Sequence, residues 1–191
     1  MAFLSPREII DIIIMTFAVG YIFYDAIRVP REDYDPLNYL GGFDWNQLYI
    51  SALIVAPGIV LHEFAHKIMA MLFGLNATFN AAYLFLGLGL LLKFLNFGFI
   101  FFVPAYVSIY GNASPLAFGI VAVAGPFTNL LIWGVCSILL KYKKINRKLV
   151  PALILAKKIN LFLFVFNILP IPGFDGYKFF VSIINTFIQI A

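Results

Sequence analysis

Long apolar segments constrain this chain more than any other feature of its sequence. Four of them approach or exceed the length of about 20 residues that a helix needs to cross the hydrocarbon core of a membrane. They are Ile9–Ile27, Asn46–Phe73, Leu116–Leu140 and Leu149–Leu169. Charged residues make up only 12% of the chain, against roughly a quarter in ordinary soluble domains. The sequence therefore excludes a soluble enzyme, a disordered chain and a nucleic-acid module, and predicts an all-α integral membrane protein with about four main transmembrane helices.

The region around residues 76–110 follows a different pattern. Thr78–Phe85 and Phe99–Tyr110 are rich in aromatic and β-branched residues, which favours strands, and the apolar segment Leu86–Phe97 between them is typical of a short helix. Pro104 confines the second strand to an edge or a bulge. Irregular backbone at membrane depth is tolerated only against protein or a water-filled cavity. We therefore expect a small membrane-associated strand or re-entrant region inside a single membrane-embedded domain, residues 1–191.

Polar residues that can carry chemistry are scarce beyond the first loop. The nine acidic residues, apart from Glu63 and Asp175, all lie at or before Asp44, and the two histidines are His62 and His66. These four side chains stand in apolar segments, where a charge costs at least a few kcal/mol. A cost of that size indicates a functional site.

Three of these residues form the motif His62-Glu63-Phe64-Ala65-His66. Residues four apart share one face of a helix, so two imidazoles at this spacing can bind one Zn²⁺ ion. Glu63 then flanks the metal without ligating it and can take a proton from an attacking water. The alternative interpretation is a buried polar patch or a structural pair of histidines.

A catalytic zinc ion usually has three protein ligands and one open position. Asp175 is the one downstream carboxylate besides Glu63, and it lies where prolines and glycines break the fourth apolar segment, in the stretch Asn167–Gly176. Its alternatives are an N-cap on the following helix or an ion pair with Lys178. The single cysteine, Cys136, excludes an internal disulfide and a multi-cysteine metal site, and we interpret it as a small buried apolar residue.

Three motifs, in this chain order, resemble the site-2 protease family of intramembrane zinc metalloproteases. The segment from His62 to His66 is similar to the H-E-x-x-H helix of that family. The segment from Ala124 to Asn129 is similar to its G-P-x-x-N element, and Asn167–Gly176 to its N-x-x-P…D-G element. The resemblance covers about residues 46–180 and leaves residues 1–45 as an accessory first helix and loop.

The resemblance implies a three-helix catalytic core made of the second, third and fourth apolar segments. It implies one Zn²⁺ per chain held by His62, His66 and Asp175, with Glu63 as the general base. The implied substrate is a transmembrane segment of another membrane protein, with Asn167 near the substrate. Asn129 is a further candidate for substrate binding, and an interhelical hydrogen bond is its alternative. We expect the lipid bilayer as surroundings, and neither nucleic acid nor a nucleotide cofactor as a partner.

Other functions fit parts of the pattern. Histidines and carboxylates at membrane depth also mark carriers or channels for a divalent metal, although carriers often show repeated halves, and no repeat is visible here. A catalytically inactive scaffold that binds transmembrane segments would not need the complete set of ligands and base. A membrane protease of the CAAX-processing type takes its third ligand from a distant Glu that this sequence lacks.

We expect a multi-pass protein of the cell membrane, with the site about a third of the way in from one face. A helix rises about 24 Å from Asn46 to His62 and about 10 Å from His66 to Phe73. The resemblance places that face toward the cytosol, so that the loops Arg28–Asp44 and Lys141–Leu149 lie outside. Most of the 13 Lys and Arg residues lie on the side of these loops, and the positive-inside rule favours the opposite orientation.

Overall fold

The computed structural model describes residues 3–25, 43–97, 103–142 and 145–190. Nearly all of the predicted loop Arg28–Asp44 lies outside these ranges, as does part of the loop Lys141–Leu149. The orientation of the chain in a membrane therefore stays a prediction.

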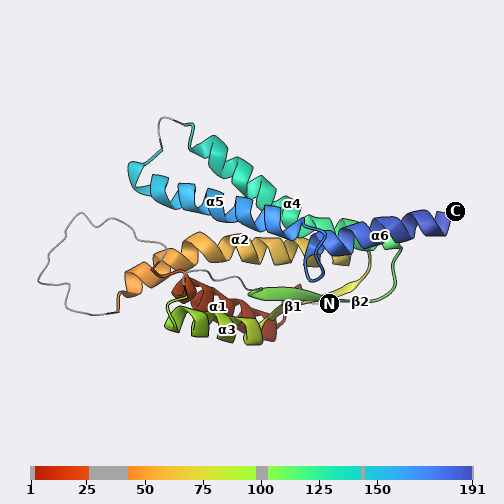
Figure 1. The fold of residues 1–191 in the computed structure, drawn as a ribbon, viewed down its shortest axis with the longest axis horizontal. Coiled ribbons are helices and arrows are strands. Elements are labelled where there is room, and N and C mark those ends of the chain that lie inside the picture. The colour runs from red at the N-terminus through yellow and green to blue at the C-terminus, as the bar shows by residue number, and fades with distance from the viewer. Residues whose placement is uncertain (1–2, 26–42, 98–102, 143–144, 191) are drawn as a thin grey trace, which may run out of the picture.

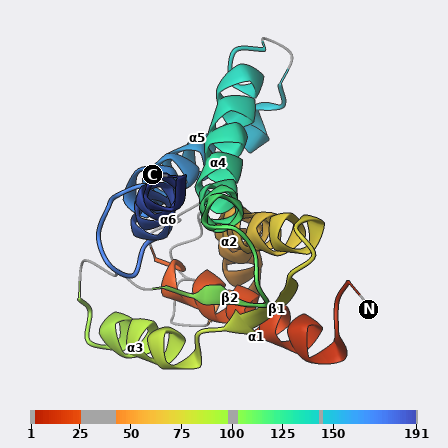
Figure 2. The same cartoon turned by 90° about the vertical axis from the view of Figure 1, so that its right-hand side faces the viewer.

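Helix α2 runs through the middle of the fold, as Figures 1 and 2 show. Helices α4, α5 and α6 lie on one side of it, and α1, α3 and a small sheet lie on the other side. In chain order the elements are α1 (Pro6–Ile22), α2 (Trp45–Leu72), β1 (Asn76–Ala81), α3 (Tyr83–Phe94), β2 (Ala105–Tyr110), α4 (Pro115–Leu139), a 3₁₀ turn (Arg147–Leu149), α5 (Val150–Asn167) and α6 (Asp175–Ile190).

Three helical stretches in the described part of the chain are long and apolar enough to cross a membrane. They are Trp45–Leu72, Pro115–Leu139 and Arg147–Asn167, which match the second, third and fourth predicted segments. The first predicted span, Ile9–Ile27, is not among them. Helix α1 has 17 residues and ends at Ile22, so the described residues contain three of the about four predicted spans.

The predicted strands are present as a two-stranded antiparallel sheet, although both are shorter than predicted. β1 pairs with β2 from Asn76 opposite Tyr110 to Ala81 opposite Ala105. The end of the predicted strand Thr78–Phe85 is wrong, because α3 begins at Tyr83. Pro104 directly precedes β2 and its carbonyl accepts from the Ala82 N–H at 3.0 Å, so this proline stands where the ladder ends. Residues 99–102 of the other predicted strand lie outside the described ranges.

Two buried carboxylates of α1 bind the outer edge of β1. Glu8 accepts from the Phe79 N–H at 2.7 Å and Asp11 accepts from the Ala81 N–H at 3.2 Å. Glu8 also forms a buried ion pair with Lys67 of α2. Burial acts to raise the pKa of Glu8, but the hydrogen bonds from Lys67, Ser5 and Phe79 outweigh it and lower the pKa to about 2. Helix α1 is therefore docked against the sheet and α2 by charged groups as well as by packing.

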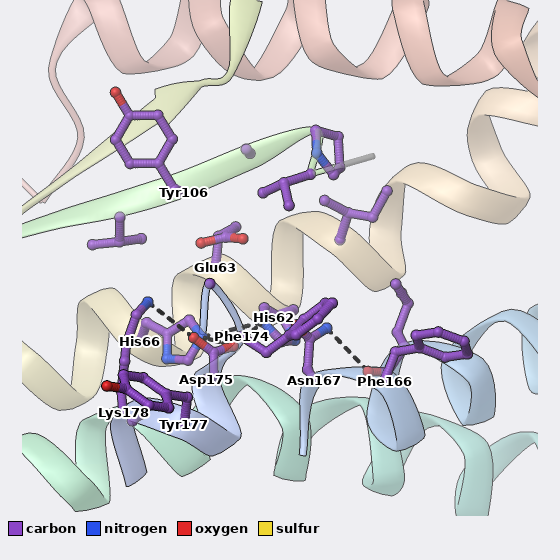
Figure 3. A pocket seen from close by; sticks show the side chains of 18 of the residues that line it. His62, Glu63, His66, Tyr106, Phe166, Asn167, Phe174, Asp175, Tyr177 and Lys178 are labelled. Atoms are coloured by element: carbon purple, nitrogen blue, oxygen red, sulfur yellow. Dashed lines mark hydrogen bonds and ion pairs between the residues drawn. The ribbon is translucent and has the colours of Figure 1, made fainter. Parts of the chain in front are cut away.

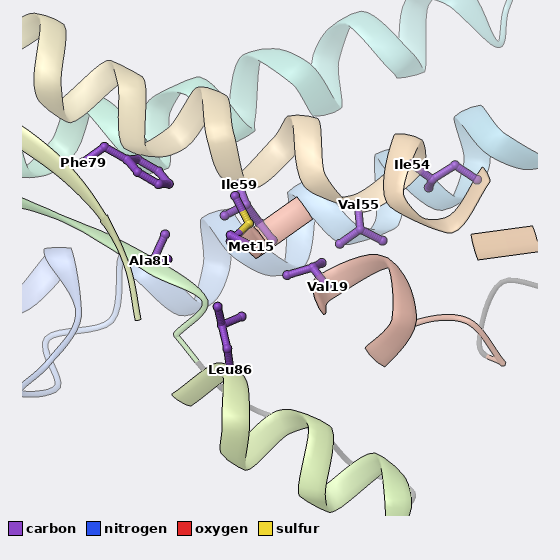
Figure 4. Packing of buried hydrophobic residues seen from close by; sticks show 9 residues of the cluster. Met15, Val19, Ile54, Val55, Ile59, Phe79, Ala81 and Leu86 are labelled. Carbon is purple, nitrogen blue, oxygen red and sulfur yellow. The ribbon is translucent and has the colours of Figure 1, made fainter. Parts of the chain in front are cut away.

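The main hydrophobic core lies where α1, α2, α3 and the sheet meet, as Figure 4 shows. It is built from buried residues of all four, namely Met15, Val19, Ile54, Val55, Ile59, Phe79, Ala81, Leu86 and Ala105. This core fixes the sheet on one side of α2. The opposite side of α2 is left for the helices that complete the candidate site.

Candidate metal centre

Side chains from two distant parts of the chain converge on one point beside α2. His62 Nε2 and His66 Nε2 lie 3.1 Å apart, and Asp175 Oδ2 lies 3.1 Å from each of them. All three residues are buried, and in the described part of the chain they form the group that could hold a metal ion. The three residues that the sequence predicts as ligands are thus brought together.

The geometry of these three atoms fits zinc. A tetrahedral zinc ion with bonds of about 2.0–2.1 Å holds its ligand atoms about 3.3 Å apart, close to the sides of this triangle. The other ring nitrogens have partners of their own: His66 Nδ1 lies 2.8 Å from the Val121 carbonyl oxygen, and His62 Nδ1 lies 2.5 Å from Asn129 Oδ1. Both imidazoles therefore turn Nε2 toward the shared point. A metal held by these three residues would keep a fourth position open, which is typical of catalytic rather than structural zinc sites.

Helix α4 can approach the two imidazoles because residue 125 is glycine. A Cβ atom on Gly125 would lie 2.6 Å from His62 Nε2, and closer still to His66 Nε2. Only a residue without a side chain lets the backbone of α4 pass here. This contact gives a physical reason for the glycine in the segment from Ala124 to Asn129.

Asp175 reaches the histidines because the loop after α5 brings the start of α6 back to the end of α5. A Cβ on Gly176 would lie 2.6 Å from the Leu169 carbonyl oxygen, so glycine allows the start of α6 to fold against the end of α5. Asp175 is the first residue of α6, where the helix dipole favours a negative charge. Its second oxygen, Oδ1, lies 3.2 Å from Lys178 Nζ. The ion pair with Lys178, considered above as an alternative to ligation, coexists with the approach to the histidines.

A pocket of about 780 Å³ opens beside this group and is lined by residues of α2, β2, α4, α5 and α6. Glu63 lines it, and Figure 3 places its carboxylate on the pocket side of α2, next to the two histidines. No described residue donates a hydrogen bond to this carboxylate, so its oxygens are available to a molecule in the pocket. Asn167 also lines the pocket, and its Nδ2 donates to the Leu163 carbonyl at 3.0 Å.

Asn129 does not line the pocket. Its side chain is fully buried at 0% exposure, and its partners are groups of α2 and α5, so its hydrogen bonds are interhelical. Its role in substrate binding stays a prediction. The sequence prediction missed Asn160 of α5, which bonds Asn129 and is also buried. A polar residue inside an apolar span was the available signal.

Comparison with known proteins finds a relative that is named as a zinc metalloprotease. No protein-family model matches it, and no solved structure does. It is 37% identical over 175 residues to a Methanocaldococcus jannaschii protein named "Putative zinc metalloprotease MJ0611", covering 91% of this chain and 83% of the relative. The chain belongs to the family of MJ0611. This relative is named as a zinc enzyme, and His62, His66 and Asp175 form a group that could hold a metal ion in this chain.

Proposed function

We propose that this chain is an intramembrane zinc metalloprotease of the site-2 protease type, which hydrolyses peptide bonds in transmembrane segments of other membrane proteins. One observation carries the proposal. His62, His66 and Asp175 share one pocket with Glu63, whose carboxylate receives no hydrogen bond from the described residues, and the pocket lies between helices long enough to span a membrane. The relationship to MJ0611 supports the zinc and the protease chemistry.

The chain supplies the groups that peptide hydrolysis requires. When bound by His62, His66 and Asp175, zinc supplies Lewis acidity, which activates a water molecule and polarises the scissile carbonyl. Glu63 takes the proton from the attacking water and passes it to the leaving amine. Asn167 lines the same pocket, and its amide has a second N–H that can donate to a substrate carbonyl.

The sheet offers a place for an extended substrate, because a helical segment must unwind before its carbonyls can be attacked. Phe79 and Ala81 point their N–H groups away from β2, toward the carboxylates of α1. In an antiparallel pair the residues opposite them, Val107 and Ala105, then point their backbone groups away from β1.

The outer edge of β2 faces the pocket. Ala105, Val107 and Ile109, whose backbone groups point to that edge, all line the pocket that Glu63 also lines. The edge of β1 is taken by α1, so the edge of β2 is the one that an extended substrate can use for strand addition. Backbone hydrogen bonds gained there would replace those lost when the substrate helix unwinds.

The experiment is cleavage of a generic membrane-spanning peptide by the purified chain in detergent, with and without a zinc chelator. Wild type should cleave and the chelator should abolish cleavage, whereas Glu63→Gln should keep its zinc and lose turnover. Asp25→Asn is a matched control, because the Asp25 side chain is 68% exposed and pairs with Lys93 away from the pocket. Undiminished cleavage by Glu63→Gln would contradict the proposal. Zinc flux into liposomes without any cleavage would favour a carrier instead.

A further inference from the structure

Two buried asparagines connect His62 to helices α4 and α5. Asn129 and Asn160 are 0% and 1% exposed, and neither lines the pocket. Asn160 Nδ2 donates to the Ala156 carbonyl at 2.8 Å, and Asn160 Oδ1 accepts from Asn129 Nδ2 at 2.8 Å. A buried amide in an apolar span is costly unless its groups are paired. In the hydrogen bonds of these two asparagines, the donor and the acceptor can be assigned.

The orientation of each amide follows from a backbone carbonyl, which can only accept a hydrogen bond. The Ala156 carbonyl requires the NH₂ group of Asn160 to face it, so the oxygen of Asn160 faces Asn129. Asn129 must then turn its NH₂ group toward Asn160. The Gly58 carbonyl, 3.1 Å from Asn129 Nδ2, demands the same orientation independently. Two fixed acceptors on two helices thus determine how Asn129 lies.

The oxygen of Asn129 is left facing His62. It lies 2.5 Å from Nδ1, and because an amide oxygen only accepts, Nδ1 must carry the proton. In the neutral imidazole this leaves Nε2, which faces the shared point with Asp175, free to bind a metal. His66 reaches the same state through the Val121 carbonyl, a backbone group. One histidine is thus oriented by backbone and the other by side chains.

We propose that Asn129 and Asn160 are positioning residues that hold His62 in the tautomer and orientation that bind the metal. Asn160 acts only through Asn129 and touches neither the ligand atoms nor the pocket. This inference rests on the metal-binding part of the proposed function and does not depend on proteolysis. Partners of this kind typically change metal affinity by about 10–100-fold.

The test measures the zinc affinity of the purified full chain by competition with a chromogenic chelator, and the visible spectrum of the cobalt-loaded chain. Asn129→Leu, which keeps the branching of the side chain but removes the acceptor, should weaken zinc binding by about 10–100-fold. Asn160→Leu should weaken it less, by about 2- to 10-fold, the factor expected for one hydrogen bond. Both should alter the cobalt spectrum.

A second measurement reads the hydrogen bond directly. The chain has two histidines, so ¹⁵N-histidine labelling of the zinc-loaded protein gives two Nδ1–H signals. The signal of His62 should shift in Asn160→Leu and exchange rapidly with water in Asn129→Leu. The signal of His66, which bonds the Val121 carbonyl, serves as the internal reference and should stay in place.

Thr128→Val is the matched control on the same helix. It removes one hydrogen bond, from the Thr128 hydroxyl to the Ala124 carbonyl, and should change neither zinc affinity nor the His62 signal. The proposal is overturned if Asn129→Leu and Asn160→Leu both bind zinc like wild type. His62→Ala distinguishes failure of the positioning role from failure of the metal site. If His62→Ala also binds zinc like wild type, the metal-site assignment itself fails.

Discussion

Replacing Gly125 by alanine tests the metal centre with a single methyl group. The new Cβ would lie 2.6 Å from His62 Nε2 and closer to His66 Nε2, inside the space that both nitrogens face. Ordinary contact begins at 3.4 Å, so the ring of His62 would have to retreat by about 0.8 Å. Metal–ligand distances tolerate only about 0.2 Å. We therefore expect zinc affinity to fall by more than about 100-fold, beyond the range for partners outside the ligand set.

The assay is chelator competition on purified Gly125→Ala, with thermal unfolding to show that the chain still folds. Gly134→Ala is the control, because it adds the same methyl group to the same helix where nothing lies within 4 Å. It should bind zinc like wild type. If Gly125→Ala instead binds zinc within about a factor of 10 of wild type, the close approach of α4 to the histidines is refuted.

Three other perturbations address the remaining parts of the site. Asp175→Ala should reduce the zinc content of the purified protein, because it removes one of three ligands, and metal analysis beside wild type checks this. Val107→Pro should raise KM for a membrane-spanning peptide without changing zinc content, because it removes an N–H on the outer edge of β2; an unchanged KM would exclude strand addition there. Lys67→Met should lower stability in thermal unfolding by about 3–5 kcal/mol, the usual cost of breaking a buried ion pair, and Glu8→Gln in the same chain should restore part of it.

The sequence singles out the residues of the candidate metal centre because lipid penalises polar groups. Few carboxylates and histidines lie beyond residue 44, and each one inside an apolar span costs free energy that a function must offset. This cost identifies the candidates His62, Glu63, His66 and Asp175. The helix period alone places His62 beside His66. The loop that brings Asp175 to them depends on the contact between Gly176 and the end of α5, which no periodicity reveals.

Other features escaped prediction because they depend on partners far away in the chain. Helix α1 resembles a membrane span in hydropathy, yet its buried face carries Glu8 and Asp11, whose partners lie on β1. The strand prediction over Thr78–Phe85 continued too far, because the local pattern of residues does not mark where pairing with β2 stops. Asn160 was overlooked although it is polar and lies in an apolar span, because its partner Asn129 belongs to another helix.

The distribution of polar groups explains how a candidate metal centre can exist in a chain of this hydropathy. The polar atoms behind the histidines are paired with helix carbonyls of Val121, Gly58 and Ala156, so they carry no unpaired desolvation cost. The pocket side instead presents the Glu63 carboxylate and the open face of the ligand triangle. The cost of burying unpaired charge is thereby confined to the atoms that a metal, a water and a substrate would satisfy. Apolar helices can hold such a site only if the supporting amides keep all their hydrogen bonds. Removing the hydrogen bond between Asn160 and Asn129 should therefore weaken metal binding.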